Sequence, residues 1–195
     1  MKCLRIIPVL LAMSAAHAAV AQPPPLDWGP PQLMMQMQQV RRSAARFVEY
    51  KELHLLNKSL QSSGKLIYIA PDELQKFTLS PAPSSLVVSG NRLTIDQFNG
   101  DSRSLALSDY PQVGALVESM RATLAGDLPA LERFYVVSLA GSEMDWTLLL
   151  TPRGRELGEL VKRIQLRGAG HDISRIDTEE SDGDRTRMII TPDPE

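Results

Sequence analysis

Apolar residues in the first part of the chain repeat at helical spacing and then change to alternation. Leu33, Met37, Val40 and Ala44 lie three or four positions apart, which predicts a helix over residues 31–44. Further along, short segments alternate apolar and polar side chains, a pattern typical of strands with one buried face. These strands are expected at residues 47–53, 64–70, 74–79, 86–88, 93–98 and 104–107.

A helical segment interrupts the strands near the middle of the chain. Asp109 is expected to cap it, and Pro111 lies where a first-turn proline costs no hydrogen bond. Gly126 is expected to end this helix, and Asp127 to cap a second, shorter one. The first helix carries one apolar stripe, formed by Val113, Leu116, Val117, Met120 and Leu124.

Alternation resumes after the helices. Strands are expected at residues 136–140, 145–151, 162–166, 172–179 and 185–191, with helical turns or a loop at 155–161. Near neighbours joined by short turns favour antiparallel pairing. We therefore predict a mainly β, α+β fold: one antiparallel sheet of about nine to eleven strands, curled into an unclosed barrel with helices over its apolar face.

The N-terminus has the three-part pattern of a secretory signal peptide. Basic Lys2 and Arg5 precede an apolar run over residues 6–16, and small residues follow, with cleavage expected after Ala21 or Ala18. Cleavage would remove Cys3, which is the only cysteine, so the mature chain would have no disulfide. Residues 22–31 hold five prolines and read as an extended leader, which leaves residues 32–195 as a single domain in the periplasm.

The sequence offers little for catalysis, metal binding or nucleic-acid binding. After cleavage, 19 basic and 23 acidic residues remain, a net charge of −4 that disfavours nucleic-acid binding. His54 and His171 have no ligand-like spacing. The acidic run at residues 177–184 lacks a calcium-loop pattern and is interpreted as a solvated hairpin. We expect no catalytic residues, metal site or cofactor; a hydrolase is the weakest alternative, because no residues can be nominated for it.

The clearest chemical feature is an apolar lining. Alternation places nine side chains together on the predicted concave face, and methionines lie on the helices that would cover it. These residues either fill a closed core or line a cavity for acyl chains. The nine residues are Phe47, Leu66, Tyr68, Phe77, Leu93, Ile95, Trp146, Leu148 and Leu150.

Several segments resemble one known family. Residues 64–71, Gly-Lys-Leu-Ile-Tyr-Ile-Ala-Pro, followed by Phe77, resemble a characteristic strand of the periplasmic lipoprotein carrier LolA and its relatives. Residues 46–49 resemble an early strand of that family, residues 85–98 its next hairpin, and residues 164–188 its last strands. The segment 146–152 and the inserted residues 126–134 resemble a LolA-like subgroup. The resemblance covers nearly all of the mature chain.

The resemblance implies an unclosed barrel whose helical lid covers an apolar cavity. It also implies a monomeric carrier, not an enzyme, that takes acyl chains of lipoproteins or other lipids from an inner-membrane donor complex to an outer-membrane acceptor. Ala70 stands where the family has an arginine, so glycolipids or fatty-acyl conjugates are alternative cargo. The alternative function is a non-carrier accessory domain of an envelope export system. The expected lid residues are Leu33, Met34, Met37, Val40, Val113, Leu116, Val117, Met120 and Leu124.

Overall fold

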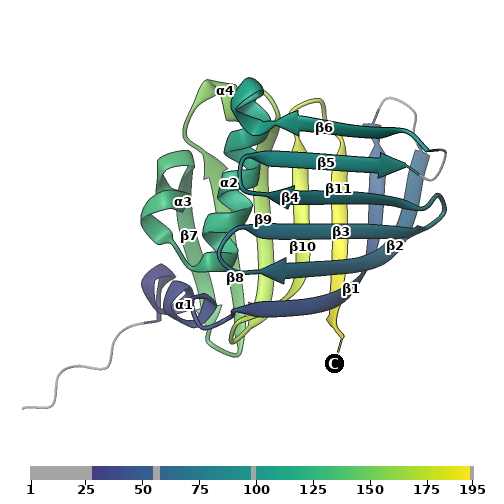
Figure 1. Ribbon diagram of the computed structural model, residues 1–195. Coiled ribbons are helices and arrows are strands. Elements are labelled where there is room, and N and C mark those ends of the chain that lie inside the picture. Colours follow the sequence, from purple (N-terminus) through teal and green to yellow (C-terminus); the bar gives the residue numbers. More distant parts are fainter. Residues whose placement is uncertain (1–27, 55–57, 98–99, 194–195) are drawn as a thin grey trace, which may run out of the picture.

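The computed structural model describes residues 28–54, 58–97 and 100–193. Figure 1 shows one large sheet with the helices gathered at one side of it. The predicted signal peptide, most of the proline-rich leader and Phe98 lie outside the described residues.

Eleven strands form a single sheet that does not close. Every neighbouring pair is antiparallel, and the order is β6-β5-β4-β3-β2-β1-β11-β10-β9-β8-β7, so β6 and β7 are the two edges. The predicted open antiparallel sheet is therefore confirmed. The strands are β1 (Arg42–Leu53), β2 (Lys58–Ile69), β3 (Glu73–Ser80), β4 (Ser84–Ser89), β5 (Arg92–Gln97), β6 (Ser102–Ala106), β7 (Tyr135–Ser142), β8 (Asp145–Pro152), β9 (Val161–Ala169), β10 (Asp172–Glu180) and β11 (Arg185–Pro192).

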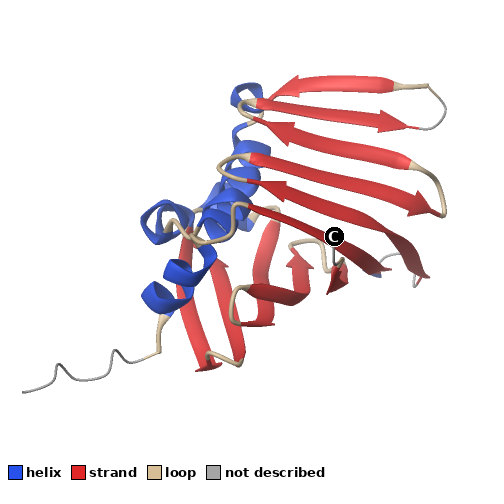
Figure 2. Ribbon diagram, turned by 60° about the horizontal axis from the view of Figure 1, so that its bottom comes forward, coloured by secondary structure: helices blue, strands red, loops and turns tan. Residues whose placement is uncertain are grey.

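The helices are short, and most lie between β6 and β7 in the chain. They are α1 (Pro30–Met37), the 3₁₀ turn η2 (Leu107–Asp109), α2 (Pro111–Ala125), α3 (Leu128–Phe134) and α4 (Arg155–Gly158). In Figure 2 they collect against one end of the curved sheet. The predicted helical insertion is thus confirmed, and helical turns are found at residues 155–158.

Local sequence signals explain most helix ends. Gly126 ends α2 with a positive φ of 68°, and Asp127 caps α3 by accepting a hydrogen bond of 3.0 Å from the Ala130 N–H group. The prediction that Asp109 caps α2 is wrong. Tyr110 holds the cap position without a side-chain bond, because Asp109 belongs to the preceding 3₁₀ turn.

The two largest differences from the predicted element boundaries are at the end of α1 and the start of β2. Helix α1 ends at Met37, not Ala44, because residues from Arg42 onward pair with β2 and, from Ala45, also with β11. Strand β2 begins at Lys58, six residues before the predicted start, and its first half is polar. A strand end that extends past the apolar core carries no alternating hydrophobic signal, so the pattern could not reveal it.

The apolar side chains form two clusters on the concave face of the sheet. The larger cluster joins α1, α3 and α4 to β7, β8, β9 and β10, and the smaller joins α2 and η2 to β4 and β5. Helix α2 contributes to both, with Ala122 in the larger cluster and Val117 in the smaller. It is therefore the element that connects the two halves of the core.

Helix α1 is held against the end of α2 by a close backbone approach. A Cβ atom added at Gly126 would lie 2.1 Å from the carbonyl oxygen of Met34. The Gln38 side-chain amide also donates to the Gly126 carbonyl oxygen at 2.9 Å. Only glycine satisfies both the positive φ and this contact.

We expect Gly126→Ala to lower the free energy of unfolding by about 1–3 kcal/mol, since it combines left-handed strain with a steric clash. Urea unfolding followed by circular dichroism measures the loss. Gly158→Ala is the matched control, because a Cβ atom there meets nothing within 4 Å; it should leave stability unchanged or slightly raised. Equal losses in the two variants would contradict the proposed contact between α1 and α2.

Candidate functional site: the concave face

Strand register brings eight of the nine predicted lining residues to the concave face. Buried Phe47 and Trp146 mark this face on the two sides of the sheet. Phe47 on β1 pairs with Gly64 on β2, so Gly64 shares its face. Leu66 and Tyr68 follow Gly64 by alternation on β2 and lie on the same face. Leu148 and Leu150 follow Trp146 by alternation, and Leu93 and Ile95 pair with Val88 and Leu86, which lie on the same face.

Phe77 does not belong to this set, and its predicted place in the lining is wrong. It pairs with Lys65, whereas Leu66 pairs with Lys76. Phe77 therefore points to the outer face and Lys76 to the concave face. This pairing continues the register that starts at the β2–β3 turn, where Tyr68 lies opposite Leu74, and the sequence pattern does not reveal it.

Two large aromatic rings lie on glycines of neighbouring strands. Phe47 is paired with Gly64, and a Cβ atom at Gly64 would come within 3.0 Å of the Phe47 ring. Trp146 is paired with Gly168, where an added Cβ atom would lie 2.4 Å from the indole. The Trp146 indole also donates to the Gly170 carbonyl oxygen at 2.9 Å. The two glycines thus make room for the rings on the inside of a bent sheet.

Most of the predicted lid residues do pack over the concave face. Leu33, Met34 and Met37 of α1 are fully buried in the larger cluster, and Val117 of α2 is buried in the smaller one. Leu116 and Val113 are half-buried against the two clusters.

Three lid predictions need correction or restriction. Met120 is 46% exposed, although it follows the buried Val117 by three residues, because the buried side of α2 beyond Val117 carries Ser119, Ala122 and Thr123 instead. Val40 lies in the turn after α1, not within a helix. Leu124 is half-buried and belongs to neither cluster.

The concave face is closed by these helices. Trp146, Leu148 and Leu131 have no exposed surface. Three grooves formed by the described residues lie elsewhere, and none is lined by any of the nine predicted residues: one on the outer face, one at the β10–β11 hairpin and one behind α2. The helices thus cover the apolar clusters of this face, while Leu66 and Ile95 are only half-buried.

The alternation of apolar residues did not reveal several members of the covered face. Tyr135 is fully buried at the start of β7, one residue before the predicted strand, and Val88, Ile164 and Leu166 are buried on β4 and β9. Alternation of Tyr135, Val137 and Leu139 is the signal that could have revealed the first of these. Burial raises the pKa of the Tyr135 hydroxyl, an effect that the nearby Ser119 hydroxyl opposes.

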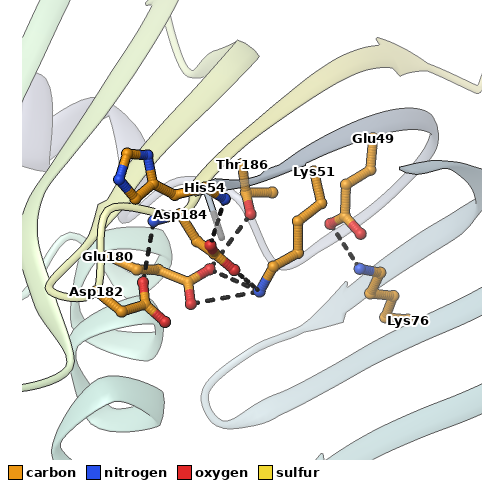
Figure 3. A network of polar contacts seen from close by, with 8 residues as sticks. All are labelled: Glu49, Lys51, His54, Lys76, Glu180, Asp182, Asp184 and Thr186. Carbon is orange, nitrogen blue, oxygen red and sulfur yellow. Dashed lines mark hydrogen bonds and ion pairs between the residues drawn. The ribbon is translucent and has the colours of Figure 1, made fainter. Parts of the chain in front are cut away.

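Beyond the helices, the concave face becomes polar. Lys76 forms an ion pair of 2.7 Å with Glu49, and its ammonium lies 4.9 Å from the centre of the Phe47 ring. Ser62 donates a further hydrogen bond of 3.2 Å to Glu49. Figure 3 shows this pair beside a second network around Lys51. The face therefore has an apolar, covered end and a charged end.

The acidic hairpin predicted to be solvated is tied to the sheet by Lys51. The carboxylates of Glu180, Asp182 and Asp184 lie within 4.8 Å of one another, and the Lys51 ammonium lies 3.0 Å from Glu180 and 3.6 Å from Asp184 (Figure 3). Burial alone would lower the pKa of Lys51, but the hydrogen bonds and charges of Glu180 and Asp184 outweigh it and raise the pKa. The lysine thus supplies the positive charge that these carboxylates need.

The two histidines lie apart and exposed. His54 donates its backbone N–H to Asp184 at 2.9 Å, and the His171 ring lies 3.7 Å from the Asp172 carboxylate. Neither histidine belongs to an apolar cluster.

Comparison with known proteins identifies the family. Residues 18–193 match the model of a family described as outer membrane lipoprotein carrier protein LolA-like, so the chain belongs to this family. Members of the LolA superfamily are binding and carrier proteins. No curated protein matches the chain.

Solved structures resemble the chain only distantly. A LolA superfamily protein from Nitrosomonas europaea has 10% identity and a TM-score of 0.45, with 84% of this chain and 92% of that chain covered. A putative outer membrane lipoprotein-sorting protein domain from Vibrio parahaemolyticus has 8% identity and a TM-score of 0.45, covering 83% and 88%. MucB from the Pseudomonas aeruginosa MucA/MucB complex has 16% identity and a TM-score of 0.44, covering 84% and 56%. Likenesses this low say nothing about function.

Within the described part of the chain, no helix is both long and apolar enough to cross a membrane.

We expect Glu49→Gln to lower the free energy of unfolding by about 1–2 kcal/mol, since it leaves the part-buried Lys76 without its charged partner. Chemical unfolding at neutral pH measures the change. Glu132→Gln is the matched control, because Glu132 is exposed on α3, and it should change stability by less than about 0.5 kcal/mol. A Glu49 variant as stable as its control would show that the ion pair does not stabilise the charged end.

Proposed function

We propose that this protein is a periplasmic carrier that binds acyl chains on the concave face of its open sheet. The observation that carries the proposal is the apolar, non-covalent contact between α2 and both halves of that face. Apolar contacts are not directional, so a lipid chain can bury the same surface that the helix buries.

In this mechanism the helices and the cargo compete for one surface. Helix α2, with α1 attached at Gly126, moves off the face as acyl chains enter. The face stays buried before and after the exchange. Burial of apolar surface contributes about 25 cal/mol of free energy per Å² in both states. Because the burial terms offset each other, loading and release differ little in free energy, and contact with an acceptor suffices to reverse the exchange.

The charged end of the face suits the polar part of an amphipathic cargo. Glu49, Lys76 and Lys51 lie next to the apolar clusters and present both charge signs. Acyl chains in the place of α2 would direct their headgroups toward these side chains. Lipoproteins, glycolipids and other fatty-acyl conjugates all satisfy this arrangement.

The carrier role includes a route between two membranes. The expected signal peptide would bring a monomeric protein into the periplasm, where an inner-membrane donor complex loads it and an outer-membrane acceptor unloads it. No step requires a cofactor or a catalytic residue.

A second candidate function is an interaction domain whose interior stays closed. The complete burial of Trp146, Leu148 and Leu131 favours it, as do grooves that lie outside the concave face. Such a domain would bind partner proteins of an envelope export system through its surface and would take up no lipid.

Two matched substitutions distinguish these functions. Val117 on α2 and Val88 on β4 are buried in the same cluster, at 8% and 1% exposure, on opposite sides of the contact. If α2 must leave the face before lipid binds, Val117→Ala favours the open form because it weakens the contact between helix and sheet. A loss of about 1 kcal/mol in this contact should tighten binding of a fluorescent fatty acid about fivefold. Val88→Ala removes part of the binding face and should weaken binding.

Fluorescence titration of purified, delipidated protein measures both effects, and thermal unfolding confirms that each variant is folded. Equal weakening by both variants would contradict competition between helix and lipid. No uptake by the wild-type protein or by either variant would favour the closed interaction domain.

A further inference from the structure

The outer face of the sheet carries a group of five arginines. They lie on β9, β10 and β11 and line a groove of about 660 Å³ that reaches β1. We call this the arginine groove; its arginines are Arg163, Arg167, Arg175, Arg185 and Arg187. The groove is on the side opposite the helices, because Ile176 and Met188 of the same strands face the concave side.

Strand register assembles the groove from residues far apart in the chain. Arg175 lies opposite Arg167 on β9 and opposite Ile189 on β11. Arg187 of β11 lies opposite Asp177 on β10 and opposite Tyr50 on β1. Like charges placed directly opposite each other destabilise a sheet, so the pairing of Arg167 with Arg175 does not serve the fold.

Two carboxylates hold some of these guanidinium groups in place. Asp177 accepts hydrogen bonds from Arg175 at 2.9 Å and from Arg187 at 3.0 Å, and Glu179 pairs with Arg163 at 2.9 Å. Partial burial would raise the pKa of Asp177, but the hydrogen bonds from both arginines outweigh it and lower the pKa. Asp177 therefore stays charged at neutral pH and orients two donors.

The groove keeps a positive excess, because five arginines line it with three carboxylates, Asp177, Glu179 and Glu52, the last of which lies opposite Arg185. Arg167 and Arg185 form no ion pair with any described residue, and Arg167 lies within hydrogen-bonding distance of the Gln165 side-chain oxygen. The whole chain has a formal net charge of −2, so this concentration of arginine is local. Guanidinium groups use their remaining N–H donors best on carboxylates or phosphates.

The shape and the apolar rim of the groove favour a polypeptide over a flat membrane surface. Tyr50 and Ile189 line it and are 36% and 44% exposed, so a bound segment gains apolar contact beside the arginines. An extended chain lying in the groove can contact the arginines and these apolar side chains together, whereas a flat bilayer surface would touch only its rim.

We propose that the arginine groove docks an acidic, extended segment of a partner protein. The partner would bind the outer face while the concave face remains available to cargo or helices. This docking does not depend on acyl-chain binding, so it holds for a carrier and for an interaction domain alike.

The test uses a fluorescein-labelled hexaglutamate peptide, with hexaglutamine as the uncharged control. Fluorescence anisotropy at low salt should show binding of the acidic peptide to the intact protein and loss of that binding at high salt. The double variant Arg167→Glu/Arg185→Glu should weaken binding at least tenfold. Both positions lie outside the hydrogen bonds of Asp177, but a glutamate at position 185 faces Glu52 and Glu179, so circular dichroism checks that the variant is folded.

The matched control is Arg133→Glu/Arg155→Glu, which makes the same charge change at exposed helix positions. It should keep binding within about twofold. Equal losses in the two double variants would overturn the proposal, since they would reflect net charge alone. Absence of peptide binding would also overturn it, as would tighter, arginine-dependent binding to phosphatidylglycerol vesicles than to the peptide. If the groove variant does not fold, Arg167→Gln/Arg185→Gln replaces it, with an expected loss of at least threefold.

Discussion

The structure depends on covering the apolar concave face of a sheet that does not close. In a closed barrel the sheet itself would surround these side chains, but here β6 and β7 remain unpaired with each other. Helix α2 provides the cover that connects both halves, since it packs on the larger cluster through Ala122 and on the smaller through Val117. Helices α1, α3 and α4 extend this cover over the larger cluster and η2 over the smaller, and Gly126 attaches α1 to α2.

This way of covering the face has a consequence for function. The helices are held to the sheet mainly by apolar packing, and the charged pairs lie beyond them at Glu49 and Lys51. Apolar packing can be exchanged for another apolar surface at little net cost, whereas exchanging a buried ion pair would leave an uncompensated charge. The division of the face into an exchangeable apolar end and a fixed charged end is what makes the carrier proposal physically reasonable.

The sequence predicted the class of fold well because its main signals are local. Alternation identified most strands, and Gly126 and Asp127 marked helix ends through their own backbone preferences. It failed where strand pairing decides the outcome: β1 extends the sheet into the predicted helix, and the pairing of Phe77 with Lys65 turns Phe77 outward. The candidate site was predicted in part for the same reason. Its apolar residues alternate visibly, but the ion pairs of Lys76 and Lys51 arise only when the strands come together. The arginines of β9, β10 and β11 meet Tyr50 only through the pairing of β1 with β11.

Hydrogen–deuterium exchange with and without oleate tests the central claim most directly, because it reports which backbone segments open. If acyl chains take the place of the helices, oleate should increase exchange in α2 and α1 while β8 and β9 keep their protection. Binding of oleate with unchanged or increased protection of α2 would contradict the account, since the helix would then still cover the face that the lipid is proposed to occupy.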